Sequence, residues 1–305
     1  MEQISFFNEP HLKIDKPIRL IELFAGIGAQ AKALENIGAD FEHYRVCEFD
    51  EHAVRSYNAI HGTSFEPSDI TKLHASDLNI VDTDKYCYIL CYSFPCQDLS
   101  SAGTKKGMQK GTGSRSSLLW EVERLLEETE NLPQILLMEN VPEVVTVYEF
   151  SQWCEYLRSK GYTNRWQTMN ANDYGIPQSR ERCLMVSWLG DYIYNFPEPV
   201  PLIKKFRDML DKEVDEKYYL TGEQVDKFLK TANVERERER VATRSDAVED
   251  ILTIEVMRGT SCLCIGSIGD RGYEYTRRVY SVSGCCPTIS TCQGGQREPK
   301  VLVYE

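Results

Sequence analysis

Short apolar runs alternate with helix-like segments along the first two-thirds of the chain, and this order constrains the fold more than any other feature. Five runs have the length and composition of buried strands: 18–24, 43–49, 85–94, 134–141 and 182–189. Four segments between or after them are predicted to be helices: 29–38, 50–60, 117–130 and 151–161. This alternation predicts a parallel, doubly wound α/β sheet with helices on both faces.

The pattern changes near Leu189, where the sequence becomes mixed, polar and less periodic. We therefore predict a first domain over residues 1–188 and a smaller mixed domain over residues 189–305, a division that suits a chain of 305 residues. Within the second domain, residues 223–240 are predicted to form a charged helix. Its alternating Glu and Arg residues indicate a solvated face rather than a DNA contact.

The composition, with 42% apolar and 27% charged residues, is that of a globular enzyme with a sizeable core. No apolar run approaches the ~20 residues that span a bilayer, and the N-terminus lacks the pattern of a secretory signal. Eleven scattered cysteines fit a reducing cytoplasm, and none of them has C-x-x-C zinc spacing, so no metal site is predicted. The net charge of −12 argues against nucleic-acid binding when taken alone, although a local basic patch can bind DNA on an acidic protein.

Small residues follow the first predicted strand, in the segment ELFAGIGA (22–29). Glycines in such a turn let a ligand approach the backbone, and the N-terminus of the next helix offers free N–H groups. The segment departs from the dinucleotide pattern G-x-G-x-x-G because residue 31 is alanine, and a tight structural turn remains the alternative.

Acidic residues follow the next two strand-like segments. Glu48 lies at the end of 43–49, and Asp69-Ile70 closes the segment 64–70, which we expect to be the third strand. A carboxylate in such a position can accept hydrogen bonds from ribose hydroxyls or an exocyclic amine, while the isoleucine packs on a base. Each acid alone is typical of an exposed loop, but together they indicate an adenosine pocket.

A turn with the sequence SFPCQ follows the run 85–94 and carries Cys96. Pro95 fixes its own φ and ends the strand, so the turn should present Cys96 at the carboxyl edge of the sheet, where ligands bind. A buried structural cysteine is the alternative, and it is how we interpret Cys87 and Cys91. The polar neighbours of Cys96 favour a reactive thiol instead.

These motifs belong to an ordered set: LFAGIG, the Glu48 strand end, Asp69-Ile70, FPCQ (94–97), RSSL (115–118), ENV (139–141) and QSRER (178–182). The set resembles the DNA cytosine-5 methyltransferase family of the bacterial and phage restriction–modification type, and it covers about residues 18–188. The resemblance implies a Rossmann-like, S-adenosylmethionine-dependent methyltransferase sheet. It also implies that residues 189–305 form a target-recognition region.

The resemblance implies a covalent mechanism on cytosine. Cys96 is the nucleophile that adds to C6, and Glu139 acts at N3 as a general acid. Arg180 and Arg182 hold the O2 side of the base and help orient Glu139, and Gln97 completes the catalytic set. Because a base inside a duplex cannot present C5 and C6 to these groups, the cytosine must be flipped out.

The implied cofactor is S-adenosyl-L-methionine, with S-adenosyl-L-homocysteine as its product. The residues assigned to its pocket follow the predicted strands or lie in the RSSL block: Phe24, Ala25, Gly26, Gly28, Glu48, Phe49, Asp69, Ile70, Pro95 and Leu118.

Double-stranded DNA is the implied partner. Residues 100–115 combine glycines with basic side chains and suit a mobile loop that contacts phosphates, with a plain surface loop as the alternative. Arginines of the second domain can read guanine, with ordinary surface arginines as the alternative. The basic residues assigned to DNA are Lys105, Lys106, Arg115, Arg258, Arg271, Arg277 and Arg278.

Full-length relatives continue with an R-x-L-T-P-R-E-like block and a final helix with a G-N-x-V-like motif, and neither occurs in these 305 residues. The alternatives are a split enzyme completed by a second polypeptide, a truncated chain or an inactive remnant, and the intact motifs favour the first two. Other functional alternatives are an RNA (tRNA) cytosine-5 methyltransferase, a non-catalytic binding fragment and, remotely, a nicotinamide dehydrogenase. The expected location is the cytoplasm of a bacterial or phage-infected cell.

Overall fold

The chain divides into two compact units in the computed structural model, which describes residues 11–97, 99, 107–216, 219, 221–223, 264–267, 278–281, 284–288 and 300–302. The first unit consists of Met1–Thr168 and Arg182–Phe196, and the second of Met169–Glu181 and Pro197–Glu305. The functional division expected at residue 188 stays a prediction.

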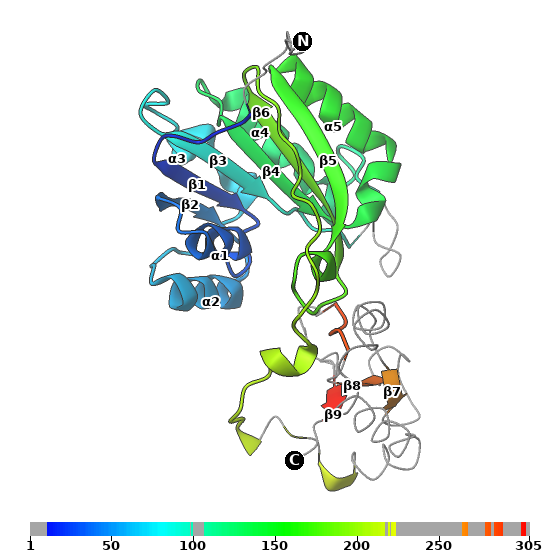
Figure 1. Ribbon diagram of the computed structural model, residues 1–305. Helices are drawn as coiled ribbons and strands as arrows, with labels where there is room; N and C mark the ends of the chain where they lie inside the picture. The colour runs from blue at the N-terminus through cyan, green and yellow to red at the C-terminus, as the bar shows by residue number, and fades with distance from the viewer. Residues whose placement is uncertain are drawn as a thin grey trace, which may run out of the picture. The chain divides into compact units, whose positions relative to one another are not determined.

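Six strands form one sheet in the order β2-β1-β3-β4-β6-β5 (Figure 1). Their bounds are β1 (Ile18–Leu23), β2 (Phe41–Cys47), β3 (Cys87–Tyr92), β4 (Ile135–Asn140), β5 (Tyr162–Asn170) and β6 (Glu181–Leu189). The strands β2, β1, β3 and β4 are parallel neighbours. Their carboxyl ends therefore lie at one edge of the sheet, where the loops that follow them meet.

The side chains of successive residues of β3 pack on opposite faces of the sheet. Tyr88, Leu90 and Tyr92 belong to one apolar cluster, which also contains buried residues of α4 (Leu119–Glu128) and α5 (Tyr148–Ser159). The alternate residues of β3 belong to a second cluster, with Ala31 of α1 (Ala29–Asn36) and Tyr57 of α2 (Glu51–His61). A strand buried on both faces needs this continuous apolar sequence.

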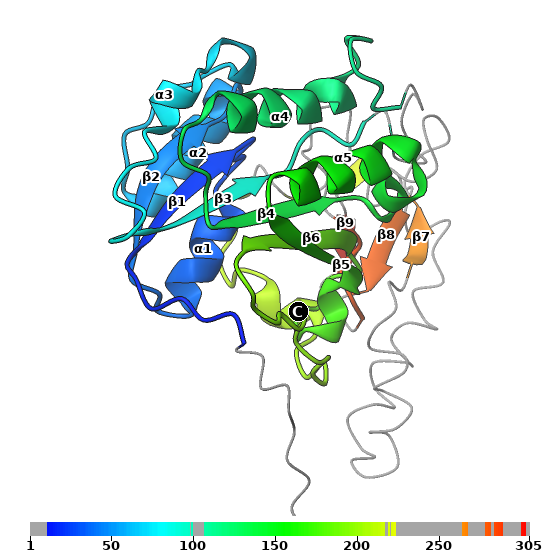
Figure 2. The ribbon, with the colours of Figure 1, turned by 90° about the horizontal axis from the view of Figure 1, so that it is seen from above.

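Figure 2 shows α4 and α5 on one side of the strands and α1 on the other. The predicted Rossmann-like α/β fold with helices on both faces is therefore confirmed. The remaining helix of the first unit is α3 (Ala75–Leu78), and short 3-10 turns are η1 (Ile70–Lys72), η2 (Arg115–Leu118) and η3 (Pro142–Thr146). Within the described residues, no helix has the length and apolar composition needed to cross a membrane.

Two expectations about the sheet are wrong. The sheet is mixed rather than parallel, because β6 pairs antiparallel with β4. The connection from β5 to β6, residues 171–180, contains only the short turn η4 (Ala171–Asp173) and no α-helix that could carry the chain back for a parallel strand. The segment 64–70 is not a strand either: it is extended without a ladder partner and leads into η1.

The second unit contains a three-stranded sheet of β7 (Cys264–Ser267), β8 (Arg278–Ser281) and β9 (Lys300–Leu302). The pair β7–β8 is antiparallel and the pair β8–β9 is parallel. The described parts of this unit also include η5 (Phe206–Met209). Of the helix expected over 223–240, all but the first residue lies outside the described residues.

Candidate functional site

The loop between β1 and α1 has a backbone that favours glycine. Phe24, Gly26 and Gly28 have φ angles of 59°, 57° and 81°. Position 28 also lacks space, because an added Cβ would lie 2.4 Å from Nε2 of His61 and 2.6 Å from a ring carbon of Tyr57. This close approach explains the glycine and packs the loop directly against α2.

Glu48, the residue after β2, is held by the loop that follows β1. Its Oε2 accepts a hydrogen bond from the backbone N–H of Gly26 at 2.9 Å, and its Oε1 accepts from that of Asp50 at 2.9 Å. The Glu48 carbonyl accepts from the N–H of Ser68 at 2.8 Å. The carboxylate therefore has a fixed position between the glycine loop and the segment that leads to Asp69.

A hollow of about 420 Å³ is lined by Phe49, the residue after Glu48, and by Pro67, Ser68, Asp69, Lys72 and Leu73. The Phe49 side chain is 77% exposed, so its ring is available to a ligand. The hydroxyl and the backbone N–H of Thr71 donate to Oδ1 of Asp69 at 2.8 and 3.0 Å and hold the pKa of Asp69 below its ordinary value. Ile70 is buried in the apolar core.

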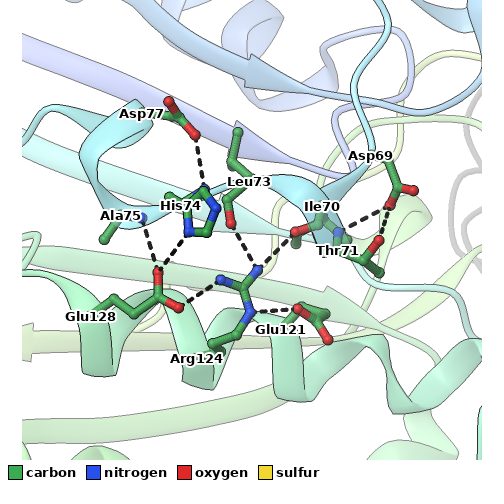
Figure 3. A network of polar contacts seen from close by, with 10 residues as sticks. All are labelled: Asp69, Ile70, Thr71, Leu73, His74, Ala75, Asp77, Glu121, Arg124 and Glu128. Carbon is green, nitrogen blue, oxygen red and sulfur yellow. Dashed lines mark hydrogen bonds and ion pairs between the residues drawn. The ribbon is translucent and has the colours of Figure 1, made fainter.

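Arg124 of α4 fixes the turn η1, as Figure 3 shows. Its Nη2 donates to the carbonyl oxygens of Ile70 at 3.0 Å and Leu73 at 2.9 Å. Glu121 and Glu128 of the same helix hold the guanidinium at 2.7 and 2.9 Å. The wall of the hollow is therefore fastened to a helix that contributes to the core of the sheet.

The turn after β3 carries Cys96, which is partly exposed, whereas Cys87 and Cys91 of β3 are buried. Burial raises the pKa of the Cys91 thiol well above its ordinary value, so that thiol stays protonated. The different exposure matches the expectation that only Cys96 of these three is reactive, although the reactivity itself stays a prediction.

Side chains of the RSSL segment anchor this turn. The Ser116 hydroxyl donates to the carbonyl oxygen of Pro95 at 2.7 Å, and Nη1 of Arg115 donates to Oε1 of Gln97 at 2.5 Å. Leu118 packs against the core, partly buried. The FPCQ and RSSL motifs, which are separate in the sequence, thus form one structure around Cys96.

Glu139 lies near the end of β4 and forms an ion pair with Arg182 of β6, with 2.9 Å between Oε1 and Nε. Their side chains are 24% and 22% exposed, so both groups remain accessible. The next residue, Asn140, is buried and donates from Nδ2 to the carbonyl oxygen of Phe94 at 3.0 Å. One hydrogen bond therefore joins the turn that carries Cys96 to the end of β4, where Glu139 lies.

Arg180 belongs to the second unit. Its N–H donates to Oδ1 of Asn170 at 2.9 Å, and its carbonyl oxygen accepts from the N–H of Ala171 at 3.0 Å. In the same unit, Ser179 and Cys286 share a 2.9 Å backbone hydrogen bond, which joins the QSRER motif to a segment more than one hundred residues later.

Several assigned DNA contacts cannot be placed in this site. Lys105, Lys106, Arg258, Arg271 and Arg277 lie outside the described residues, and Arg278 is in β8. All of them stay predictions.

Three structural roles were missed from the sequence: those of Arg124, Ser116 and Glu22. Glu22 is buried, and its carboxylate accepts from the Tyr57 hydroxyl at 2.6 Å and the Ala31 N–H at 3.3 Å. Burial raises the pKa of Glu22 above its ordinary value. Ser116 and Glu22 lie in segments that the sequence analysis singled out, RSSL and ELFAGIGA, but their roles depend on contacts with distant segments that no motif reveals. Arg124 lies in no such segment.

The sheet, the glycine loop and the hollow lined by Phe49 and Asp69 define a Rossmann-like methyltransferase, with a partly exposed cysteine at the carboxyl edge of its sheet. The model of the C-5 cytosine-specific DNA methylase family matches residues 18–292. The chain therefore belongs to the C-5 cytosine-specific DNA methylase family.

Named relatives agree with this membership. The chain is 35% identical over 264 residues to the orphan methyltransferase M.SssI of Spiroplasma monobiae, with 68% of each chain covered. It is 26% identical over 353 aligned residues to the orphan methyltransferase M.SPBetaI of Bacillus phage SPbeta, with 93% of this chain and 73% of the relative covered. The type II methyltransferase M2.ScrFI of Lactococcus lactis is 32% identical, with 68% of this chain and 71% of the relative covered. These relatives confirm the restriction–modification type expected from the motifs.

Solved structures show the same fold. The S. pombe Dnmt2 methyltransferase has a TM-score of 0.55 at 23% identity, with 70% of this chain and 66% of that chain covered. The Entamoeba histolytica methyltransferase EhMeth has a TM-score of 0.57 at 22% identity, with 68% and 63% covered. The chain thus spans about two-thirds of the length of these structures.

Proposed function

We propose that this chain transfers a methyl group from S-adenosylmethionine to C5 of a flipped-out cytosine in a specific DNA sequence, through a covalent bond between Cys96 and C6. The observation that carries the proposal is the Asn140–Phe94 hydrogen bond, because it joins the turn of Cys96 to the end of β4, where Glu139 lies. Family membership supports the reaction class and favours DNA as the substrate.

The described residues suit the proposed cofactor. The hollow of about 420 Å³ is within the range of small-molecule sites, roughly 300–1,000 Å³. The fixed carboxylate of Glu48 can accept from ribose hydroxyls, and the exposed ring of Phe49 can cover a base. When bound, S-adenosylmethionine supplies an electrophilic methyl group on a positively charged sulfur.

Cys96 would supply the electrons that make C5 reactive. Its thiolate adds to C6, a C–S bond forms, and the electron pair of the C5–C6 double bond becomes available at C5 for attack on the methyl group. The C5 proton then leaves, the C–S bond breaks, and the thiolate and the aromatic ring are restored. The hydrogen bonds of Ser116 and Asn140 to this turn hold Cys96 in position for both steps.

Glu139 and Arg182 would stabilise the charge that addition creates. Negative charge reaches N3 of the ring, where a carboxyl group can donate a proton, an effect worth roughly 10²–10⁴-fold in rate. The ion pair with Arg182 fixes the direction of the Glu139 side chain. Arg180 and Gln97 are proposed to complete the contacts of the base and its backbone.

Covalent trapping tests the proposal. Duplex DNA that contains 5-fluorocytosine cannot lose its C5 substituent as a proton, so the enzyme should remain attached to it after methyl transfer. We expect an adduct with the unaltered chain, none with Cys96→Ala, and an undiminished one with Cys87→Ala, because Cys87 is buried in β3. Trapping by Cys96→Ala at the normal level would reject the covalent role of Cys96.

Methyl transfer to duplex DNA and to tRNA should be measured side by side, since an RNA cytosine methyltransferase is the alternative. Methyl transfer to DNA alone supports the proposal. Methyl transfer to tRNA alone overturns the proposal that the substrate is DNA. Binding of the cofactor and DNA without turnover would indicate a fragment that needs a partner chain. The second polypeptide expected from the resemblance stays a prediction.

A further inference from the structure

Three metal-ligating side chains converge from three different elements, next to the glycine loop but outside the proposed catalytic site. They are Glu35 of α1, His43 of β2 and His61 at the end of α2, and one ligand atom of each lies within 4.8 Å of the others. Oε1 of Glu35 is 2.6 Å from Nδ1 of His61 and 3.8 Å from Nε2 of His43.

The hydrogen bonds of His43 determine which of its nitrogens carries the proton. The Tyr57 hydroxyl donates its hydrogen to Glu22 at 2.6 Å, so its oxygen accepts from Nδ1–H of His43 at 2.8 Å. Nε2 of the neutral ring then has a lone pair directed at Glu35.

The same reasoning applies to His61. Its Nε2 faces the carbonyl oxygen of Ile27 at 3.1 Å, and a carbonyl can only accept, so Nε2 carries a hydrogen. Its Nδ1 lies 2.6 Å from Oε1 of Glu35, which is a hydrogen-bond distance, so without a metal ion a proton on Nδ1 joins the ring to the carboxylate. A divalent ion that binds Nδ1 would displace this proton.

The proton on His61 joins only one of the two imidazoles to Glu35. Nε2 of His43 lies 3.8 Å from the same oxygen, beyond hydrogen-bond distance, so its lone pair is not used in that contact. Each ring also donates its other N–H to the protein. His61 donates to the carbonyl oxygen of Ile27, and His43 donates to the Tyr57 hydroxyl, which in turn donates to a carboxylate. That outer arrangement is typical of histidines that bind metals.

We propose that Glu35, His43 and His61 form a binding site for one divalent transition-metal ion of the zinc type. Two imidazoles and a carboxylate are ligands that zinc accepts, with water at the remaining position. Lys32 holds Oε2 of Glu35 at 2.7 Å, which leaves Oε1 for the ion. Ligand atoms about 2.0–2.1 Å from zinc are roughly 3.3 Å apart in a tetrahedron and at most about 4.2 Å apart. The longest separation in the cluster must therefore shorten by less than about 1 Å, and the 2.6 Å pair of Glu35 and His61 must open by less than about 1 Å.

The ion would join α1, β2 and α2 behind the cofactor loop, because His61 also contacts the loop at Ile27. The site is independent of the proposed methyl transfer, and its test therefore needs no activity measurement. An ion that binds only the folded chain also raises the melting temperature.

The experiment is a calorimetric titration of Zn²⁺ into the full chain after treatment with a chelator. We expect one site that His43→Gln and His61→Gln each weaken by at least about 100-fold, since loss of an outer-shell partner alone costs 10–100-fold. His52→Gln is the matched control, because His52 lies on the same helix as His61 with an exposed side chain. It should bind zinc as the unaltered chain does and show the same rise in melting temperature.

Glu35→Gln provides a second test if a histidine variant does not fold, since Glu35 is partly exposed and glutamine has the same shape. It should also weaken zinc binding while the melting temperature without metal stays near that of the unaltered chain. Absence of zinc binding by the unaltered chain would overturn the proposal. Equal zinc affinity of all variants would overturn it as well, because the ion would then be bound by cysteines or exposed histidines elsewhere.

Discussion

Asn140 is the residue that connects the two halves of the proposed catalytic site. It is 2% exposed, and its amide bonds both the carbonyl oxygen of Phe94 and the N–H of Val141. Asn140→Ala leaves these buried groups without a partner, so we expect a loss of about 1–3 kcal/mol in the free energy of unfolding. We also expect a clearly slower formation of the covalent adduct with 5-fluorocytosine DNA, because the Cys96 turn loses an anchor.

Ser187→Ala is the matched control for this prediction. Ser187 is equally buried, on β6 of the same sheet, and among the described residues its hydroxyl has no hydrogen-bond partner. Its removal should change the free energy of unfolding, measured by urea denaturation, by no more than a few tenths of a kcal/mol. The rate of covalent trapping should stay the same. Equal effects of the two substitutions would show that the Asn140 hydrogen bond has no special part in the site.

Residues of the site could be predicted from the sequence where a motif marks them, and not where only a contact does. Cys96, Glu139 and Arg182 lie in short motifs, and the sequence placed them in one site before any geometry was known. Arg124 has no such motif, because its effect depends on two carbonyl groups about fifty residues earlier. The Glu35 cluster has no sequence signature for a similar reason, because Glu35, His43 and His61 come from three separate elements and share no motif.

At the scale of elements, the junction between β1 and α1 depends on Gly28. Gly28→Ala combines a left-handed backbone with contacts of 2.4 and 2.6 Å between the new Cβ and side chains of α2. The backbone strain costs about 1–2 kcal/mol, and overpacking adds typically 1–3 kcal/mol. We expect a large fall in the free energy of unfolding, measured by urea denaturation, and weaker cofactor binding.

Gly38→Ala separates the cost of backbone strain from the cost of overpacking. Gly38 follows the same helix and has a φ of 67°, but no atom lies within 4 Å of an added Cβ. This variant should lose only the backbone part, about 1–2 kcal/mol, and bind the cofactor normally. If both variants lose the same stability, the close packing of Gly28 on His61 and Tyr57 is not a constraint on the fold.

The helix α4 should control cofactor affinity through Arg124. Arg124→Met removes the hydrogen bonds to the carbonyl oxygens of Ile70 and Leu73 and so frees the turn that carries Asp69. A hydrogen bond from a charged group contributes about 1.5 kcal/mol or more, which corresponds to a roughly tenfold rise in the Kd of S-adenosylmethionine. Arg158→Met on α5, an exposed arginine, should leave the Kd unchanged in the same calorimetric titration. A rise in both variants would indicate an effect of charge alone.

Among the elements, those with a strong apolar pattern were predicted and those without one were not. The strands β1, β3, β4 and β6 are apolar runs, and each agrees with its predicted range within a few residues. The strand β5 has a largely polar, exposed sequence, YTNRWQTMN, and was not predicted. Because the direction of β6 depends on the short connection from β5, missing β5 led to the wrong prediction of an all-parallel sheet.

For the whole molecule, the net charge of −12 opposes DNA binding unless basic side chains are concentrated at the contact surface. Each phosphate contact contributes about 0.9 to the slope of log K against log salt concentration on duplex DNA. Lys105 and Lys106 follow the proposed nucleophile in the sequence and are the contacts expected from it. We therefore expect the double variant Lys105→Gln, Lys106→Gln to reduce the slope by about 1.8, measured by fluorescence anisotropy across a salt series.

The matched control for this pair is Lys16→Gln, Lys85→Gln. Lys16 precedes β1 and Lys85 precedes β3, so both lie at the amino edge of the sheet, opposite to the turn that carries Cys96. This double variant makes the same change in net charge, and its salt slope should stay that of the unaltered chain. An equal fall in affinity with an unchanged slope in both double variants would mean that overall charge decides binding. Lys105 and Lys106 would then no longer be assigned to the DNA contact.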